Sequence, residues 1–324
     1  MKMLYLVCDG GGTKTDFLLF DEKGNVLAAD RQGGANANFI APQQAADAVV
    51  EGISRCLSQA GASPADIRLT SLFIPGFRPA MERLEARFPQ MEFRQAGDEK
   101  NAFYAALGLP YGIAVLAGTG SFATGCSRDG RSTKAGGWGP LFGDEGSGYH
   151  IGVLCLARLA RLSDQGRAGS VLEQEALRFL NLEDVPALRE AAYQPDFTRA
   201  RVAQLSRVVA KAAALGDEDA CAILDQAAAE LAELAAVVAA RLGEQDLPVS
   251  LTGGLTAMGE LFCGRFRTKL STVLPRSTYV PAKYTPVIGA ALCVLSEEAG
   301  VDIRSAELLR NLLQKEKGDT DVDG

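Results

Sequence analysis

The sequence predicts an α/β protein built from two related halves. Apolar runs short enough to be strands alternate with segments whose apolar residues recur at helical spacing. With 324 residues, 47% of them apolar, the chain is long enough to bury two cores. A strand, a turn rich in glycine and threonine, and a second strand occur near the N-terminus and again after Gly112, which favours two halves of similar design.

The first half reads as an antiparallel meander followed by alternating helices and strands. The meander strands are expected at Leu4 to Val7, Phe17 to Phe20 and Val26 to Ala29, with a turn containing Gly24 before the third. Apolar residues at helical spacing predict a helix from Pro42 to Ala60, which Gly61 ends. The elements expected next are a strand at Leu69 to Ile74, a helix at Pro79 to Arg87, a strand near Glu92 and a helix at Asp98 to Leu107.

The second half opens with the repeated hairpin and continues with helices. Its strands are expected at Ile113 to Leu116 and Phe122 to Cys126, and residues 151–243 read as mostly helical. A strand at Val249 to Leu251 and a helix within Tyr284 to Leu295 follow. We therefore expect an N-terminal domain of residues 1–112, joined by a C-terminal helix at about 302–315, and a C-terminal domain of 113–301 with a helical insertion.

Composition excludes several classes of partner. The net charge of -7 is scattered and no basic run is present, so we expect no nucleic acid partner. No uncharged run approaches the roughly 20 residues of a membrane span, and no signal peptide is recognisable. Seven dispersed cysteines without a C-x-x-C pair indicate a reducing, cytoplasmic compartment. A single histidine, His150, rules out a histidine-rich metal site.

Three glycine-rich turns follow apolar strands, at Asp9 to Thr15, Ala117 to Ser121 and Thr252 to Thr256. Such a turn either relieves a steric constraint or lets backbone N–H groups approach an anion. Each of these turns carries hydroxyl groups, and the first also carries a carboxylate and a lysine. This combination, repeated three times, favours phosphate binding.

The common nucleotide loops do not fit. No Gly-Lys dipeptide occurs, so the G-x-x-x-x-G-K-[ST] loop is absent. The segment Gly118 to Ala123 loosely satisfies G-x-G-x-x-A, but a hairpin is expected to follow it instead of a helix. The remaining hypothesis is a pair of β-hairpin phosphate loops with a third loop for the nucleoside.

The three turns resemble the two phosphate loops and the adenosine loop of the actin, heat-shock ATPase and sugar kinase superfamily. Their order and spacing match from Leu4 to about Leu295. Within that superfamily, the segment GGWGPLFGDEGSGYHIG at Gly136 to Gly152 resembles the signature of N-acetylglucosamine kinases and the related BadF/BadG/BcrA/BcrD-type ATPases. The resemblance implies two actin-like (ribonuclease H-like) domains with a nucleotide cleft between them.

The resemblance also implies an activity, the ATP-dependent phosphorylation of an amino sugar at the 6-hydroxyl, with ATP and Mg²⁺ as cofactors. Asp98 falls where these kinases carry their catalytic aspartate, which can accept the proton of the sugar hydroxyl. Its alternative interpretation is an N-cap for the helix from Glu99 to Leu107, and the two roles are compatible. Asp9 would orient hydrated magnesium.

Positions for the nucleotide and the sugar follow from the same resemblance. The residues expected to bind the nucleotide are Asp9, Gly11, Gly12, Thr13, Lys14, Thr15, Gly118, Thr119, Gly120, Ser121, Gly253 and Gly254. The residues expected to bind the sugar are Asn36, Asp98, Gly137, Trp138, Asp144 and Glu145, with Asn38 as the alternative to Asn36. An ordinary turn would also explain Asn36, and a core position would also explain Trp138. His150 is interpreted as a helix residue beside the pocket.

The sequence departs from the pattern at FIPGF, Phe73 to Phe77, where N-acetylglucosamine kinases carry a Ser-Gly-Gly turn. The identity of the sugar therefore stays open among N-acetylglucosamine, glucosamine and N-acetylmuramate, and a homodimer is also left open.

An alternative function is that of an ATPase activator of a partner redox enzyme of the 2-hydroxyacyl-CoA dehydratase or benzoyl-CoA reductase type. Such an activator would hold an iron-sulfur cluster through Cys126 and Cys155. A sugar sensor without turnover is disfavoured because Asp98 is present.

Overall fold

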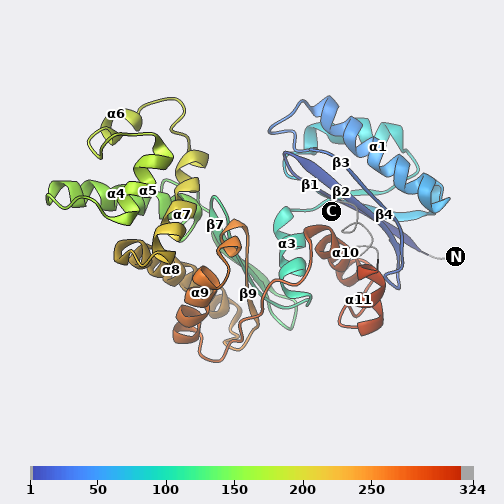
Figure 1. The fold of residues 1–324 in the computed structure, drawn as a ribbon. Helices are drawn as coiled ribbons and strands as arrows, with labels where there is room; N and C mark the ends of the chain where they lie inside the picture. The colour runs from blue at the N-terminus through green and yellow to red at the C-terminus, as the bar shows by residue number, and fades with distance from the viewer. Residues whose placement is uncertain (1–2, 315–324) are drawn as a thin grey trace. The chain divides into compact units, whose positions relative to one another are not determined.

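The computed structural model describes residues 3–314 of the chain. Its described residues form two compact units, each with its own sheet. One unit runs to Pro110 and resumes at Lys283, and the other comprises Tyr111–Ala282 (Figure 1). The division expected from sequence assigned residues 283–301 to the second domain, whereas the contacts group them with the first unit. The expected domain limits otherwise stay a prediction.

The first unit is built on a five-stranded sheet in the order β3-β2-β1-β4-β5. Its strands are β1 (Leu4–Gly10), β2 (Lys14–Asp21), β3 (Val26–Gly33), β4 (Ile67–Phe73) and β5 (Phe93–Gln95). The first three strands pair antiparallel, as the meander predicted, and β4 and β5 run parallel to β1. The carboxyl ends of β1, β4 and β5 therefore lie at one edge of the sheet.

Helices cover both faces of this sheet. They are α1 (Pro42–Ala60), α2 (Met81–Arg87), α3 (Asp98–Leu107), α10 (Pro286–Glu297) and α11 (Ala306–Leu313), with short 3₁₀ turns at Pro64–Asp66 and Arg78–Ala80. Helix α1 shares a core with alternate residues of β1, and α10 packs on β1 from the other face. Helix α10 also approaches α3 so closely that a Cβ at Gly289 would lie 2.1 Å from the Asn101 carbonyl oxygen. This contact ties α10 to the first unit.

The second unit repeats the same sheet design with four strands in the order β8-β7-β6-β9. The strands are β6 (Gly112–Ala117), β7 (Ser121–Cys126), β8 (Ser132–Gly136) and β9 (Val249–Thr252). Strands β6 to β8 form an antiparallel meander and β9 lies parallel to β6, just as β4 lies parallel to β1. The two sheets thus share the topology that the repeated hairpin predicted.

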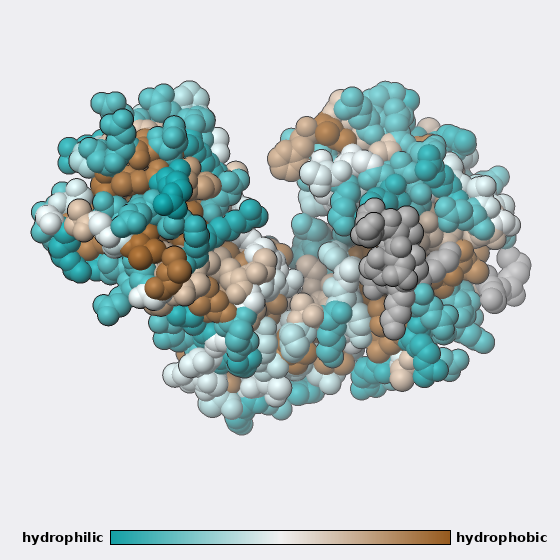
Figure 2. Space-filling model, viewed as in Figure 1, coloured by the Kyte–Doolittle hydropathy of each residue, from teal (hydrophilic) through white to brown (hydrophobic). Residues whose placement is uncertain are grey.

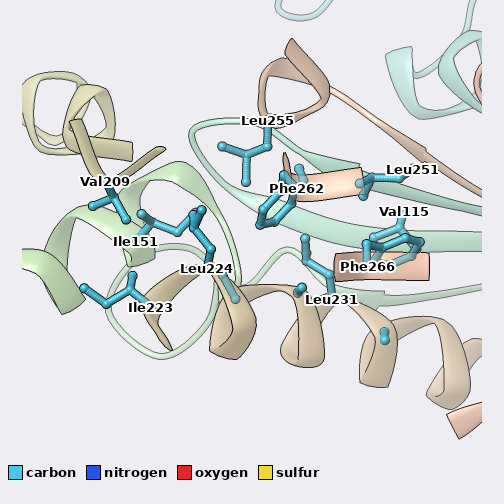
Figure 3. Close-up of a cluster of buried hydrophobic side chains, with 14 of the residues drawn as sticks. Val115, Ile151, Val209, Ile223, Leu224, Leu231, Leu251, Leu255, Phe262 and Phe266 are labelled. Atoms are coloured by element: carbon cyan, nitrogen blue, oxygen red, sulfur yellow. The ribbon is translucent and has the colours of Figure 1, made fainter. Parts of the chain in front are cut away.

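The helices of the second unit pack against one another and against this sheet. They are α4 (Gly148–Asp164), α5 (Val171–Leu180), α6 (Leu188–Ala191), α7 (Arg199–Ala214), α8 (Glu218–Leu242) and α9 (Glu260–Val273), with a 3₁₀ turn η3 at Gly254–Met258. Figure 3 shows side chains from the strands and from α4, α7, α8 and α9 converging on one core. Helices α4 and α7 cross closely, because a Cβ at Gly152 would lie 2.1 Å from the Val202 carbonyl oxygen.

Helix limits were predicted better than strand limits. Helices α1 and α3 begin and end where expected, whereas β1 extends to Gly10 and β2 begins at Lys14. Asp9 and Thr15 therefore lie within paired strands, and the turn itself is short. The expected C-terminal helix at about 302–315 is α11, and residue 315 lies outside the described residues.

On the visible face, hydrophilic residues predominate and hydrophobic ones form smaller groups (Figure 2).

Candidate active site

The turn between β1 and β2 is tied to the loop that follows β3. The Gly11 N–H donates to the Lys14 carbonyl at 2.9 Å, and the Gly11 carbonyl accepts from the Asn36 N–H at 3.1 Å. Gly34 makes this approach feasible, because a Cβ there would lie 2.3 Å from the Gly12 carbonyl oxygen. The predicted first phosphate loop is thus anchored to the loop after β3, while Gly12, Thr13 and Lys14 stay exposed.

The side chains predicted to bind phosphate from this turn differ in accessibility. Thr13 and Lys14 are exposed, and Lys14 Nζ lies 3.0 Å from Asp16 Oδ2. Thr15 is fully buried and donates its hydroxyl proton to the Gly33 carbonyl at 3.0 Å. Thr15 therefore supports the strand pairing in this structure, and its direct contact with phosphate stays a prediction.

Asp9 lies near the end of β1 and faces the N-terminal turn of α3. Its Oδ1 accepts a hydrogen bond from Asn101 Nδ2 at 2.5 Å. Burial raises the pKa of Asp9 to about 6, the Asn101 hydrogen bond opposes this shift, and the charges of Asp16 and Asp98 add to it. The neighbourhood is thus rich in negative charge and suited to a cation.

Asp98 is the first residue of α3 and is exposed. The N-cap is Gly97, so the interpretation of Asp98 as the cap of a helix starting at Glu99 is wrong by one residue. An acidic side chain in the first turn interacts favourably with the helix dipole. Helix α3 therefore begins with the exposed Asp98, and three residues later on the same side of the helix Asn101 donates to Asp9.

The two candidate asparagines occupy different positions. Asn36 is 6% exposed, and its Oδ1 accepts the Asn38 N–H at 2.9 Å, which closes a local turn. Asn38 is exposed and its side chain lies beside Gly76, where a Cβ would come within 2.6 Å of Asn38 Nδ2. Gly76 has φ 71°, a conformation that suits glycine. Asn36 thus has a loop-closing role, and both amides stay candidates for the sugar.

The bulky residues of the FIPGF segment point into the core. Ile74 and Phe77 are both fully buried, and Ile74 lies against Gly10, where a Cβ would come within 3.0 Å of its side chain. Only Pro75 and Gly76 of this turn are partly exposed. The departure from Ser-Gly-Gly therefore changes mainly the buried residues that pack under the turn between β1 and β2, and it changes little of the exposed surface.

The predicted second phosphate loop connects β6 to β7 and is hydrogen-bonded to the start of α4. The Gly118 N–H donates to the Gly120 carbonyl at 2.9 Å. The first residues of α4 donate back to the loop, from the Gly148 N–H to the Gly118 carbonyl at 2.8 Å and from the Tyr149 N–H to the Thr119 carbonyl at 3.2 Å. These bonds fix the loop backbone through α4.

Asp144 and Glu145 lie underneath this loop. The Ser121 hydroxyl donates to the Glu145 carbonyl at 2.6 Å, and the Ser121 N–H donates to Asp144 Oδ1 at 3.3 Å. Asp144 has a left-handed backbone, with φ 62°, and its other oxygen pairs with Arg199 Nη2 at 2.5 Å. Asp144 is 3% exposed, so in this structure its carboxylate serves the loop, whereas Glu145 is exposed. Direct sugar contacts by either residue stay predictions.

The segment after β8 forms an exposed apolar loop. Trp138 is 73% exposed, and Leu141 and Phe142 are exposed as well. The loop is tight, because a Cβ at Gly143 would lie 2.8 Å from the Trp138 Cβ, and Gly137 has φ 73°. The alternative that placed Trp138 in the core is wrong, since most of this residue is exposed to solvent.

A cavity of about 560 Å³ lies in the second unit between α7 and η3. Gly118, Thr119 and Gly148 are among its lining residues, so the cavity adjoins the predicted second phosphate loop. Of the two predicted nucleoside residues, Gly254 lines it and Gly253 does not. Gly253 has φ 100° and lies against β6, where a Cβ would come within 2.6 Å of the Ala117 carbonyl oxygen.

His150 lies in the first turn of α4, as interpreted from the sequence. Its Nδ1 lies 3.1 Å from the Gly146 N–H and 2.9 Å from Glu230 Oε2. The neutral ring accepts from Gly146, and the protonated ring donates to Glu230. The Glu230 hydrogen bond raises the pKa of His150, against the opposing effect of partial burial.

With this geometry in place, the comparison with known proteins is decisive for the family. The profile of the BadF/BadG/BcrA/BcrD ATPase family matches residues 8–294. The chain belongs to that family. This BadF-type ATPase is 28% identical over 316 residues to N-acetyl-D-glucosamine kinase of Dictyostelium discoideum, covering 92% of this chain and 99% of the relative. It is 29% identical over 307 residues to N-acetylmuramic acid/N-acetylglucosamine kinase of Clostridium acetobutylicum, covering 91% and 99%.

A solved structure has a fold similar to that of this BadF-type ATPase. A Chromobacterium violaceum protein, provisionally named an N-acetylglucosamine kinase, superposes with a TM-score of 0.67 at 26% identity. The match covers 90% of this chain and 99% of that protein. The expected mixed α/β fold with two actin-like sheets is confirmed.

The donors around Asp9 suit magnesium better than a transition metal. Among residues 3–314, no group of three or more His, Cys, Asp or Glu side chains could hold a metal ion. Magnesium needs no such cage, since one or two carboxylates, substrate phosphates and water suffice. The partly buried Asp9 carboxylate, with Asp98 nearby, fits this pattern. No helix in the described part of the chain is long and apolar enough to cross a bilayer.

Two residues at the site were missed by sequence reasoning. Asn101 lies three positions after Asp98, a spacing that places both on one side of α3 and could have been noticed. Arg199 lies 55 residues after Asp144, in a segment without a motif, so no local pattern pointed to it. Within each unit, the structure gathers the predicted residues at one loop region.

Proposed function

We propose that this BadF-type ATPase is an ATP-dependent kinase that phosphorylates an amino sugar, N-acetylglucosamine or glucosamine, at the 6-hydroxyl. The observation that carries the proposal is the arrangement on α3, which presents Asp98 outward and holds Asp9 through Asn101. The two relatives over nine-tenths of the chain are amino-sugar kinases, which supports the same substrate class.

The reaction assigns a distinct task to each group. The Asp98 carboxylate accepts the proton of the sugar hydroxyl while that oxygen forms a bond to the γ-phosphorus and the bond to the ADP oxygen breaks. Backbone N–H groups and the side chains of Thr13 and Lys14 bind phosphate oxygens, as does the loop Gly118–Ser121. A magnesium ion held by Asp9, the nucleotide phosphates and water would neutralise charge on the phosphates.

The alternative, an ATPase activator of a redox enzyme, fits less well. Cys155, one of its two candidate cluster ligands, is fully buried in the second unit, and burial raises the pKa of its thiol to about 12. A ligand to a cluster shared at a subunit surface would have to be accessible and readily deprotonated. Cys126 alone does not supply a site.

Purified protein with ATP and magnesium, screened for ADP release with N-acetylglucosamine, glucosamine, N-acetylmuramate and glucose, tests the proposal. We expect turnover to require an amino sugar, glucose to be a poor substrate, and phosphorus NMR of the product to show a 6-phosphate. Sugar-independent ATP hydrolysis by a protein that contains stoichiometric iron after anaerobic purification would support the activator instead.

A further inference from the structure

Arg199 is the first residue of α7, and its guanidinium group lies directly at the second phosphate loop. Gly120, in the middle of that loop, has no side chain, and a Cβ added there would lie 2.8 Å from Arg199 Nη2. The guanidinium is therefore in contact with bare loop backbone, at the place where the sequence predicts phosphate binding. No motif drew attention to this arginine.

The position of this guanidinium is fixed by a buried carboxylate. Arg199 Nη2 donates to Asp144 Oδ2 at 2.5 Å, and the Asp144 side chain is only 4% exposed. Asp144 is itself held, because its other oxygen accepts the Ser121 N–H of the loop. The Arg199 guanidinium also lies 5.9 Å from the centroid of the Tyr149 ring.

Enough of Arg199 stays accessible to bind an anion. Its side chain is 44% exposed, and a guanidinium group has five N–H donors, of which the pair with Asp144 uses one. Ala203, one turn further along the same side of α7, lines the cavity together with Ala200, and this cavity also reaches Gly118 and Thr119. Arg199 thus lies next to residues that line the cavity and in contact with the loop that adjoins it.

Charge gives this arginine a specific task. The chain carries a net charge of -7, so a polyphosphate must be attracted by local cations. We propose that Arg199 contacts the phosphate groups of ATP beside Gly118–Ser121, and that Asp144 positions its guanidinium group. The proposal rests on the use of ATP inferred above. It assigns Arg199 to phosphate recognition, with the adenosine moiety recognised independently of it.

Binding measurements on the full chain without sugar test this assignment. Titration calorimetry would compare ATP, inorganic tripolyphosphate and adenosine on the unmodified protein, Arg199→Gln, Arg199→Lys and Arg201→Gln. Arg201 is a matched control, because it lies in the same turn of α7 and pairs with Asp196 instead of Asp144. We expect Arg199→Gln to weaken ATP and tripolyphosphate by about tenfold or more, because charged hydrogen bonds are lost, and to leave adenosine unchanged. Arg199→Lys should be intermediate and Arg201→Gln should match the unmodified protein.

Several outcomes would overturn the assignment. Unchanged ATP affinity in Arg199→Gln would remove the phosphate contact, and an equal loss of ATP and adenosine affinity would make Arg199 a structural residue only. If the unmodified protein bound no ATP, the assignment and the kinase function would fail together. If it bound ATP and phosphorylated none of the sugars, only the kinase function would fail, and the Arg199 binding data would still decide this proposal.

Discussion

Asn101 donates a hydrogen bond from Nδ2 to Oδ1 of Asp9 at 2.5 Å, across 92 residues of sequence. Asn101 is 2% exposed, and its Oδ1 accepts the Ala102 N–H at 2.9 Å, which leaves Nδ2 to face Asp9. The bond orients a carboxylate that burial would otherwise leave poorly satisfied. A residue that contacts neither sugar nor nucleotide in the proposed reaction is therefore expected to matter for it.

Asn101→Ala should raise the magnesium concentration that gives half-maximal turnover by about tenfold or more. The reason is that losing a partner that orients a metal-binding carboxylate typically weakens metal binding to that extent. Activity measured against magnesium at saturating ATP and sugar checks this. Asn311→Ala is the control, because Asn311 lies in the same unit and donates to the Lys23 carbonyl. Equal magnesium dependence in all three proteins would show that Asn101 only packs α3.

Asp98→Asn should lower kcat by about 10²-fold or more, because an amide keeps the shape of the carboxylate but cannot accept the proton of the sugar hydroxyl. ATP affinity should change little. Turnover and ATP binding would be measured on the variant and on Glu99→Gln, which alters the neighbouring acidic residue of the same helix turn. Turnover of Asp98→Asn equal to that of Glu99→Gln would limit Asp98 to a favourable interaction with the helix dipole.

The repeated hairpin and the helical spacing predicted both sheets and the limits of α1 and α3, because these features depend on local periodicity. The unit to which α10 belongs was not predictable in this way. A helix was expected within Tyr284 to Leu295, but its partner, α3, is evident only from the close approach of Gly289 to Asn101. Contacts of long sequence separation leave no periodic trace in one sequence.

The predicted site residues divide along the same line. Loop glycines and Asp98 were recognisable because their neighbours in sequence form the motif. The burial of Thr15 and Asp144 was not predictable from the sequence, because it depends on the strand and the loop that pack over them. Arg199 was missed for the same reason, since it meets Gly120 only through the close crossing of α4 and α7.

The pair of His150 and Glu230 should make the second unit more stable in mildly acidic solution. Its hydrogen bond raises the pKa of His150 from the ordinary 6.5, so this contribution is complete below that value and is lost as pH rises through the raised pKa. The same bond lowers the pKa of Glu230 against the effect of burial, so the contribution also disappears as pH falls through the lowered pKa of Glu230, whose ordinary value is 4.5. Glu145 lies near enough to strengthen the charged form of His150.

Thermal unfolding of the unmodified protein and of Glu230→Gln over a range of pH checks this window. The difference in Tm should be largest at about pH 5.5 and should shrink as pH rises through the raised pKa of His150, above which the imidazole is neutral and accepts the Gly146 N–H. Glu233→Gln, a change of the same chemistry on the same helix, is the control. A difference in Tm that is constant across this range would mean that Glu230 acts through packing alone.

Trp138 is the only tryptophan of the chain and is 73% exposed, so its fluorescence reports on one accessible position. The free protein should emit at the long wavelengths typical of a water-exposed indole. If the loop around Trp138 binds the sugar, the correct amino sugar should change this emission saturably without nucleotide, because contact with the ring removes water from it. Titrations with N-acetylglucosamine, glucosamine, N-acetylmuramate and glucose, with Trp138→Phe as the blank, would rank the sugars directly. A response that requires ATP would mean that Trp138 senses a change elsewhere in the protein, and flat traces for a sugar that is nevertheless phosphorylated would remove this residue from the sugar site.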